Sequence, residues 1–127
     1  MNPKTILVVD DEFYAAEILT FVLESEGYRV LTAVNGRDGL DKLKLSPIDL
    51  VILDVMMPIM NGAEMAHAMR ADPALARLPI LITSAVSEAV FRAMFDRYQG
   101  FLRKPFRMPE VLAAVSSLLS DENRRSA

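Results

Sequence analysis

Three uninterrupted apolar runs, each followed by a segment with helical periodicity, constrain the fold of this chain more than any other feature. The runs lie in KTILVVD (residues 4–10), DLVILDV (49–55) and LPILITSA (78–85). A strand with one face in water alternates apolar and polar residues, whereas these runs leave no polar face. Continuous Val, Ile and Leu are typical of parallel strands covered by helices on both sides. The runs therefore predict a sheet buried between two helical layers.

The remaining segments complete five strand–helix units. Two further short strands are expected at residues 29–33 and 100–104. Helices are expected in residues 12–28, 36–46, 62–71, 87–98 and 108–120. The alternation indicates an α/β protein with a (βα)5 doubly wound, parallel five-stranded sheet. We expect one domain over residues 1–120, followed by a polar tail over 121–127.

Composition excludes several classes of function. The 127 residues include no cysteine, which leaves neither disulfides nor thiolate metal sites. The net charge is −3, which does not favour direct contact with nucleic acid. No apolar run is long enough for a membrane span, and the N-terminus does not have the pattern of a signal peptide. We expect a cytoplasmic protein that is a monomer or a weak dimer.

Chemically distinctive side chains follow the predicted strands. Asp10 and Asp11 follow the first strand, Asp54 ends the third, Ser84 the fourth and Lys104 the fifth. In an open parallel α/β sheet, the carboxyl ends of the strands lie at one edge, where ligands bind. These five residues should therefore meet there.

Carboxylates packed together repel one another unless a cation lies between them. Mg²⁺ prefers such oxygen ligands and keeps several waters. An ionised Asp54 beside the metal is a suitable nucleophile towards phosphorus. Lys104 and the hydroxyl of Ser84 would then stabilise charge on the phosphoryl oxygens.

Four motifs are similar to those of a known protein family: LVVDDE (7–12), LVILDVMMPIMNG (50–62), PILITSA (79–85) and FLRKPF (101–106). In order and spacing they resemble the receiver domain of bacterial two-component response regulators, across essentially the whole chain. The resemblance implies a flavodoxin-like fold, and it alone supplies the strand order 2-1-3-4-5.

The resemblance also implies roles at the acidic edge. Asp54 would be the phosphoacceptor. Asp11, Asp54 and the backbone carbonyl of Met56 would bind Mg²⁺ directly, and Asp10 would act mainly through a metal-bound water.

Further roles concern the change on phosphorylation. Ser84 would be the switch hydroxyl that moves to the phosphoryl group, and Lys104 would pair with that group. Phe101 occupies the aromatic switch position, and the Lys104–Pro105 peptide bond is expected to be cis.

In such a system the phosphoryl group comes from a phosphohistidine on a sensor histidine kinase or a histidine phosphotransfer protein. The protein would catalyse only its own phosphorylation and dephosphorylation, and would signal to a downstream protein or relay. We favour a stand-alone receiver. The alternative is a receiver module from a multidomain regulator or hybrid histidine kinase, with its signalling face used for dimerisation or for contact with an output domain.

The segment between Ser84 and Phe101 is shorter than the resemblance implies, so the fourth helix or the loop after it should be shortened. One interpretation of its apolar stripe is a core-facing surface with solvated arginines. The other is a partner surface on the fourth helix, fifth strand and fifth helix. That surface would comprise Arg92, Phe95, Arg97, Tyr98, Phe101, Arg103 and Arg107.

Two other functions, phosphatase activity and flavin binding, fit the residues less well. A phosphatase that forms an aspartyl phosphate generally needs an acid two residues after the nucleophile, where this chain has Met56. A flavin-binding module would need a Gly/Ser/Thr-rich phosphate loop after the first strand, and this chain has Asp10, Asp11 and Glu12 there.

The resemblance implies that Met56 and Val86, two residues after Asp54 and Ser84, flank the phosphoryl group. Neither side chain can orient an attacking water, so we expect slow hydrolysis of the phosphoryl group. The single histidine, His67, is expected to have no role in the chemistry.

Overall fold

The computed structural model describes the backbone of residues 2–126 and the side chains of residues 2–120. The strands are β1 (Thr5–Val9), β2 (Arg29–Ala33), β3 (Leu50–Asp54), β4 (Ile80–Ser84) and β5 (Gly100–Arg103). The helices are α1 (Phe13–Ser25), α2 (Gly36–Leu45), α3 (Gly62–Ala71), α4 (Glu88–Met94) and α5 (Met108–Ser126). All paired strands are parallel, in the order β2-β1-β3-β4-β5, which confirms the expected flavodoxin-like topology.

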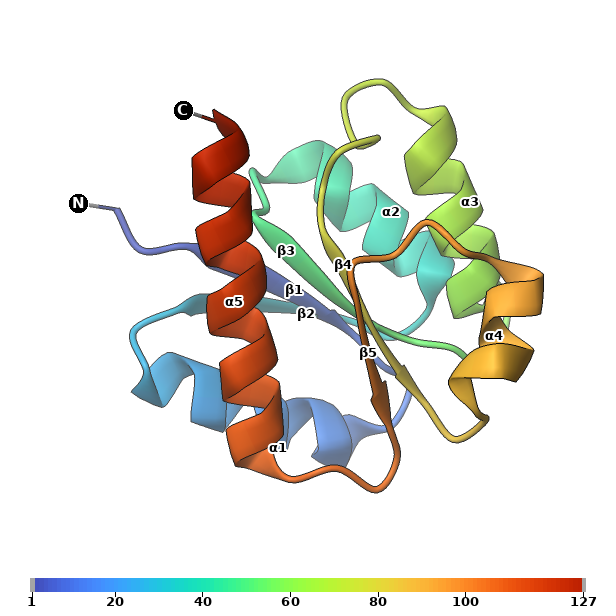
Figure 1. Ribbon diagram of the computed structural model, residues 1–127, viewed down its shortest axis with the longest axis horizontal. Coiled ribbons are helices and arrows are strands. Elements are labelled where there is room, and N and C mark those ends of the chain that lie inside the picture. The colour runs from blue at the N-terminus through green and yellow to red at the C-terminus, as the bar shows by residue number, and fades with distance from the viewer. Residues whose placement is uncertain (1, 127) are drawn as a thin grey trace.

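The sheet separates two hydrophobic cores (Figure 1). Helices α1 and α5 cover one face, and α2, α3 and α4 cover the other. Successive residues of the central strands point to opposite cores: Leu50 and Ile52 contact the α1–α5 layer, whereas Val51 and Leu53 contact the other layer. This double coverage explains why the strands have no polar face.

Two helix boundaries differ from the sequence-based expectation. Helix α4 ends at Met94, although the apolar spacing predicted a helix to residue 98. Phe95 is extended (φ −162°, ψ 133°), and its side chain is only 3% exposed. Burial of this ring therefore outweighs the helical periodicity after Met94. Helix α5 continues to Ser126, past the boundary expected at residue 120.

Several helix ends follow from local capping. The Asn61 side chain accepts a hydrogen bond from the Glu64 backbone N–H (2.9 Å), and Glu64 accepts one from the Asn61 N–H (3.0 Å). This capping box starts α3 directly after the loop that follows β3. Among the described residues, no helix is long and apolar enough to cross a membrane.

Candidate functional site

Three carboxylates meet at the carboxyl edge of the sheet, as the sequence predicted. Asp10 and Asp11 lie between β1 and α1, and Asp54 is the last residue of β3. One oxygen from each lies within 4.8 Å of the others. Asp10 and Asp54 are buried, with 5% and 6% of their surface exposed, whereas Asp11 is exposed. The site therefore opens to solvent on the side of Asp11.

The rigid end of β3 holds Asp54 in place. Every residue of β3 is buried, and Asp54 pairs with Thr83 of β4. Gly62 packs directly behind it, because a Cβ atom at this position would lie 2.2 Å from the Asp54 carbonyl oxygen. The Gly62 N–H also donates to the carbonyl of Val55 (2.8 Å). A residue with a side chain at position 62 would thus displace the end of the strand that carries Asp54.

Asp10 is held by backbone contacts on both sides. Its N–H donates to the Ala33 carbonyl of β2 (3.0 Å). Its Oδ1 atom accepts a hydrogen bond from the Glu12 N–H (2.9 Å). One carboxylate oxygen is therefore engaged with the protein, and Oδ2 faces the ammonium group of Lys104.

Lys104 is the cation of the site. Its Nζ atom lies 3.1 Å from Asp54 Oδ1 and 4.0 Å from Asp10 Oδ2. Its backbone N–H donates to the carbonyl of Ser84 (2.7 Å), which ties the end of β5 to that of β4. The Lys104–Pro105 peptide bond is cis, as expected.

Burial raises the pKa values of both Asp10 and Asp54 above their ordinary value, because an ionised carboxylate loses hydration inside the protein. Lys104 acts in the opposite direction on both groups but does not cancel this effect. The ammonium group of Lys104 thus faces two of the three acids, Asp10 and Asp54. The all-oxygen donor set, with one exposed member, suits Mg²⁺, which binds through one or two carboxylates and keeps water ligands.

Ser84 and Phe101 lie on the side of the site towards β4 and β5. The Ser84 side chain is fully buried, and its hydroxyl donates to the Val86 carbonyl (3.1 Å) and accepts from the Val86 N–H (3.0 Å). Phe101 is half-buried, and its ring lies 6.0 Å from that of Tyr98 and 6.1 Å from that of Phe91. In this structure the hydroxyl of Ser84 is therefore bonded to its own loop.

Part of the expected partner surface is interior. Phe95 is buried, so it supports the α4–β5 segment from inside and cannot itself contact a partner. Tyr98 is half-buried; its hydroxyl donates to Glu88 Oε2 (2.6 Å) and accepts from Arg92 Nε (3.2 Å). The core-facing interpretation of the stripe is thus correct for Phe91 and Phe95, both of which are buried.

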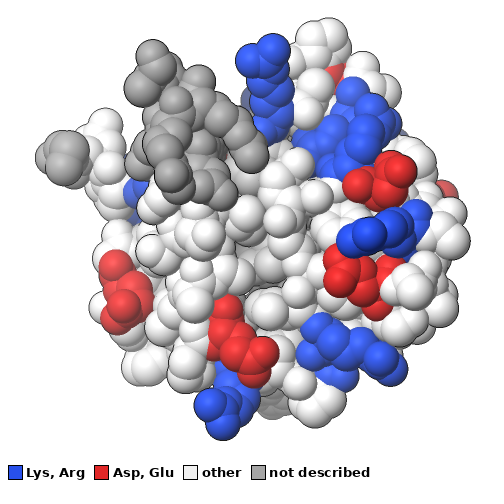
Figure 2. Space-filling view, viewed as in Figure 1, with Lys and Arg blue, Asp and Glu red and all other residues white. Residues whose placement is uncertain are grey.

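The arginines of the expected surface are exposed, but Arg103 and Arg97, like Arg92, already contact groups of the protein itself. Arg103 Nε donates to the Ala85 carbonyl (3.2 Å), next to Ser84. The Arg97 guanidinium lies 6.0 Å from the centre of the Phe95 ring. Arg107 is exposed at the start of α5. Figure 2 shows this side of the molecule, where positive and negative residues gather along the edge formed by α4.

Sequence reasoning did not identify Arg70, which connects two loops. From α3, Arg70 Nε donates to the Arg97 carbonyl (3.0 Å) and Nη2 to Gln99 Oε1 (2.9 Å). Its Nη1 atom donates to the carbonyls of Leu75 (3.3 Å) and Leu78 (2.9 Å). An arginine in a helix gives no signal of such contacts, because most helical arginines are solvated.

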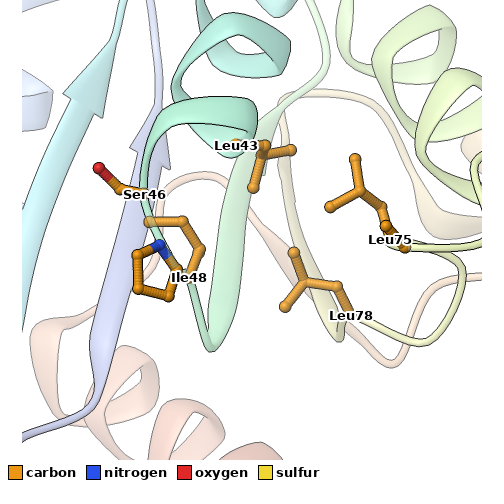
Figure 3. A pocket seen from close by; sticks show the side chains of 7 residues that line it. Leu43, Ser46, Ile48, Leu75 and Leu78 are labelled. Atoms are coloured by element: carbon orange, nitrogen blue, oxygen red, sulfur yellow. The ribbon is translucent and has the colours of Figure 1, made fainter.

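Leu75 and Leu78 also line a separate pocket. This pocket of about 230 Å³ lies before β3 and β4 and is lined mainly by leucine, isoleucine, proline and alanine (Figure 3). Leu43 and Ile48 face the two leucines across it. It therefore lies at the opposite end of the strands from Asp54 and is not part of the acidic site.

The family model described as the response regulator receiver domain matches residues 6–116. The chain belongs to this family. Its curated relatives include PhoP of Bacillus subtilis, the alkaline phosphatase synthesis transcriptional regulatory protein, which is 37% identical over 94% of this chain and 49% of its own length. The response regulator ArlR of Staphylococcus aureus is 36% identical over 90% of this chain and 52% of its own length. This receiver domain thus spans about half the length of these relatives.

Solved structures confirm the fold. The signal receiver domain of a histidine kinase from Syntrophus aciditrophicus matches with a TM-score of 0.87 and 32% identity, over 93% of this chain and 91% of the other. The Vibrio cholerae chemotaxis protein CheY4 matches with a TM-score of 0.86 and 29% identity, covering 91% and 98%. TrrA from Thermotoga maritima, solved in complex with Mg²⁺ and BeF, gives 0.82 and 35%, covering 91% and 98%.

Proposed function

We propose that this receiver domain accepts a phosphoryl group on Asp54 in the presence of Mg²⁺ and passes the signal to another protein. The observation that carries the proposal is the convergence of three carboxylates and one ammonium group at the end of β3. Three acids at the partly buried edge of the sheet repel one another, and this repulsion destabilises the fold. A purely structural role therefore does not account for the cluster.

In the proposed reaction, one oxygen of Asp54 attacks phosphorus and the bond from phosphorus to the donor breaks. The donor is a phosphohistidine on a histidine kinase or a phosphotransfer protein. The second nitrogen of its ring is protonated, so that the imidazole leaves as the neutral ring when the P–N bond breaks. Asp11, Asp54 and the carbonyl of Met56 would hold Mg²⁺, with Asp10 contributing through water. When bound, the ion supplies positive charge beside the phosphoryl oxygens.

Lys104 would pair with the new group, a role supported by the contact of its ammonium group with the Asp54 carboxylate. Ser84 would have to exchange its two bonds to Val86 for one to a phosphoryl oxygen. The ring of Phe101 would then move as well, because it packs against Phe91 of α4 in the partly buried space between β5 and α4. This movement would change the surface around Arg92, Arg97 and Tyr98.

The direct test is intact mass spectrometry of the protein incubated with Mg²⁺ and acetyl phosphate. We expect a mass increase of one phosphoryl group that is removed by neutral hydroxylamine and absent without Mg²⁺. The matched control is Asp54→Ala, which keeps the other two acids and should show no increase. An unmodified wild-type protein, or a modified Asp54→Ala protein, would refute the proposal.

A second candidate comes from the lengths of the relatives. Because this chain covers about half of PhoP and ArlR, the same switch could act on an attached output domain through the α4–β5–α5 face. Beryllofluoride, which mimics the phosphoryl group, should then cause a dimer that stops at two copies. Sedimentation velocity with and without beryllofluoride distinguishes this candidate from signalling as a monomer.

A further inference from the structure

Met56 is the most exposed methionine among the residues that the structure describes. It is 67% exposed, and Met94 follows at 42%, whereas Met65 and Met69 are fully buried. The other methionines with described side chains are half-buried: Met57, Met60 and Met108. The chain contains no cysteine, so methionine thioethers are the sulfur groups that an oxidant can attack. An oxidant in solution should therefore react first at Met56.

Met56 lies on the same side of the chain as Asp54. Val51 and Leu53 of β3 pack in the core beneath α2, α3 and α4, and Val55, one residue past the strand, packs in the same core. The alternation of the strand therefore continues beyond Asp54, and Met56 returns to the side of the Asp54 carboxylate. Position 56 thus places an oxidisable sulfur, open to solvent, beside the carboxylate that would accept the phosphoryl group.

Oxidation would change how the side chain at position 56 interacts with water. The thioether sulfur is only a weak hydrogen-bond acceptor, whereas the sulfoxide is polar and its oxygen accepts hydrogen bonds from water. With hydrogen peroxide, the sulfur forms a bond to one oxygen and the O–O bond breaks. The proton of that oxygen passes to the departing hydroxide, which leaves as water. The sulfur is oxidised and the peroxide is reduced, so the reaction needs no further reactant.

We propose that Met56 is a site of reversible oxidation by peroxides, and that its sulfoxide shortens the lifetime of phosphorylated Asp54. This inference rests on the proposed phosphorylation of Asp54. The sulfoxide oxygen accepts a hydrogen bond from a water beside the phosphoryl group and orients it for attack. The water oxygen bonds to phosphorus, the bond from phosphorus to Asp54 breaks, and the carboxylate returns while both water protons stay with the released phosphate. Reduction of the sulfoxide restores the thioether and the longer lifetime.

Brief treatment with dilute hydrogen peroxide, followed by removal of the peroxide, tests both parts of the proposal. Intact mass should first rise by one oxygen atom per chain, and peptide mapping should locate that oxygen at Met56. The oxidised protein is then phosphorylated with acetyl phosphate and Mg²⁺, and loss of the phosphoryl group is followed by intact mass after the acetyl phosphate is removed. We expect the half-life to shorten several-fold on oxidation and to recover after treatment with methionine sulfoxide reductase.

Three variants separate position 56 from general oxidative damage. Met56→Leu keeps an apolar side chain without sulfur, so its half-life should not respond to peroxide. Met94→Leu removes the next most exposed sulfur, at the end of α4, and should respond like the wild type. Met56→Gln carries an amide oxygen in place of the sulfoxide oxygen and should show the short half-life without peroxide.

Two results would overturn the inference while phosphorylation stands. One is a first oxidation at a methionine other than Met56, and the other is an equal or longer half-life in the oxidised wild type. An unoxidised protein that takes up no phosphoryl group would instead refute the proposed function, and the inference with it.

Discussion

The ammonium nitrogen of Lys104 lies 3.1 Å from the Oδ1 atom of Asp54, although the two residues are 50 positions apart in sequence. The pairing occurs because β3 and β5 both end at the carboxyl edge of the sheet, with β4 between them. Lys104 faces Asp54 and Asp10, and Asp11 adds a third carboxylate, so the acids of the site outnumber its one ammonium group.

Replacing Asp10 by asparagine should stabilise the metal-free protein at neutral pH. Since burial raises the pKa of Asp10 above its ordinary value of 3.8, the folded state binds this proton more tightly than the unfolded chain does. The contribution of Asp10 to stability is therefore fully present below pH 3.8 and is lost as pH rises through the raised pKa. At pH 7 the carboxylate destabilises the fold, and Asp10→Asn should raise the free energy of unfolding by about 1 kcal/mol.

Urea unfolding in the presence of a chelator measures this effect. The gain should shrink as pH is lowered towards the ordinary carboxyl pKa. Asp41→Asn, a change at an exposed acid on α2, serves as the control and should show no comparable gain. A destabilised Asp10→Asn protein at pH 7 would contradict the argument.

Asp11 should matter for Mg²⁺ but not for folding. Its side chain is exposed, so Asp11→Asn should leave the free energy of unfolding without metal within about 0.5 kcal/mol of the wild type. Mg²⁺ at about one hundred times its dissociation constant should stabilise the wild type by about 2.7 kcal/mol. This stabilisation is measured as a rise in the thermal midpoint of unfolding. The same Mg²⁺ concentration should raise the midpoint of Asp11→Asn much less than that of the wild type. Equal rises in both proteins would remove Asp11 from the set of ligands.

The sequence specified the site well because its position depends on topology. Once β1, β3 and β5 are parallel strands of one sheet, Asp10, Asp54 and Lys104 must share one edge, whatever the details of packing. The order of the strands was not derivable in this way and came from the family resemblance. The burial of Asp10 and Asp54, which raises their pKa values, also required the structure.

Features that depend on tertiary packing escaped sequence reasoning. The apolar spacing of Phe91, Met94, Phe95 and Tyr98 predicted one continuous helix, but the backbone extends at Phe95. The Phe95 ring packs edge-on against His67 of α3, with ring centres 5.0 Å apart. His67 Nε2 also lies 3.0 Å from the Met94 carbonyl, so it satisfies the end of the shortened helix. No local pattern reveals these contacts between α3 and α4.

Substituting Met56 by asparagine should accelerate loss of the phosphoryl group. The Met56 side chain is 67% exposed, two residues after Asp54, and its thioether cannot orient an attacking water. An amide at this position can, so the half-life of phosphorylated Asp54, followed by intact mass after removal of acetyl phosphate, should shorten several-fold. An unchanged half-life would show that position 56 does not limit hydrolysis.

Ile59→Asn is the matched control in the same loop. Ile59 is 81% exposed and has a positive φ of 69°, which is strained for a β-branched residue. Asparagine tolerates this conformation, so the change should stabilise the fold by about 0.5–1 kcal/mol. It should leave the half-life unaltered, which separates a general effect of asparagine in this loop from an effect at position 56.

Arg70 connects the segment after α4 to the loop before β4, and we expect its replacement to destabilise the segment after α4. Its guanidinium donates to Arg97 and Gln99 on one side and to Leu75 and Leu78 on the other. Lysine keeps the positive charge but cannot reproduce this planar fork of donors. Arg70→Lys should therefore lower the free energy of unfolding by about 1–2 kcal/mol.

Hydrogen exchange localises the Arg70 effect. The amides of residues 95–99 and 75–78 should exchange faster in Arg70→Lys, while those of β1 and β3 should change only as much as global stability does. Arg77→Lys, at an exposed arginine between α3 and β4, is the matched control. If exchange in residues 95–99 is unaltered, the position of this segment depends on burial of Phe95 and not on Arg70. If exchange rises there alone, Arg70 connects the loop before β4 to the segment that leads into Phe101.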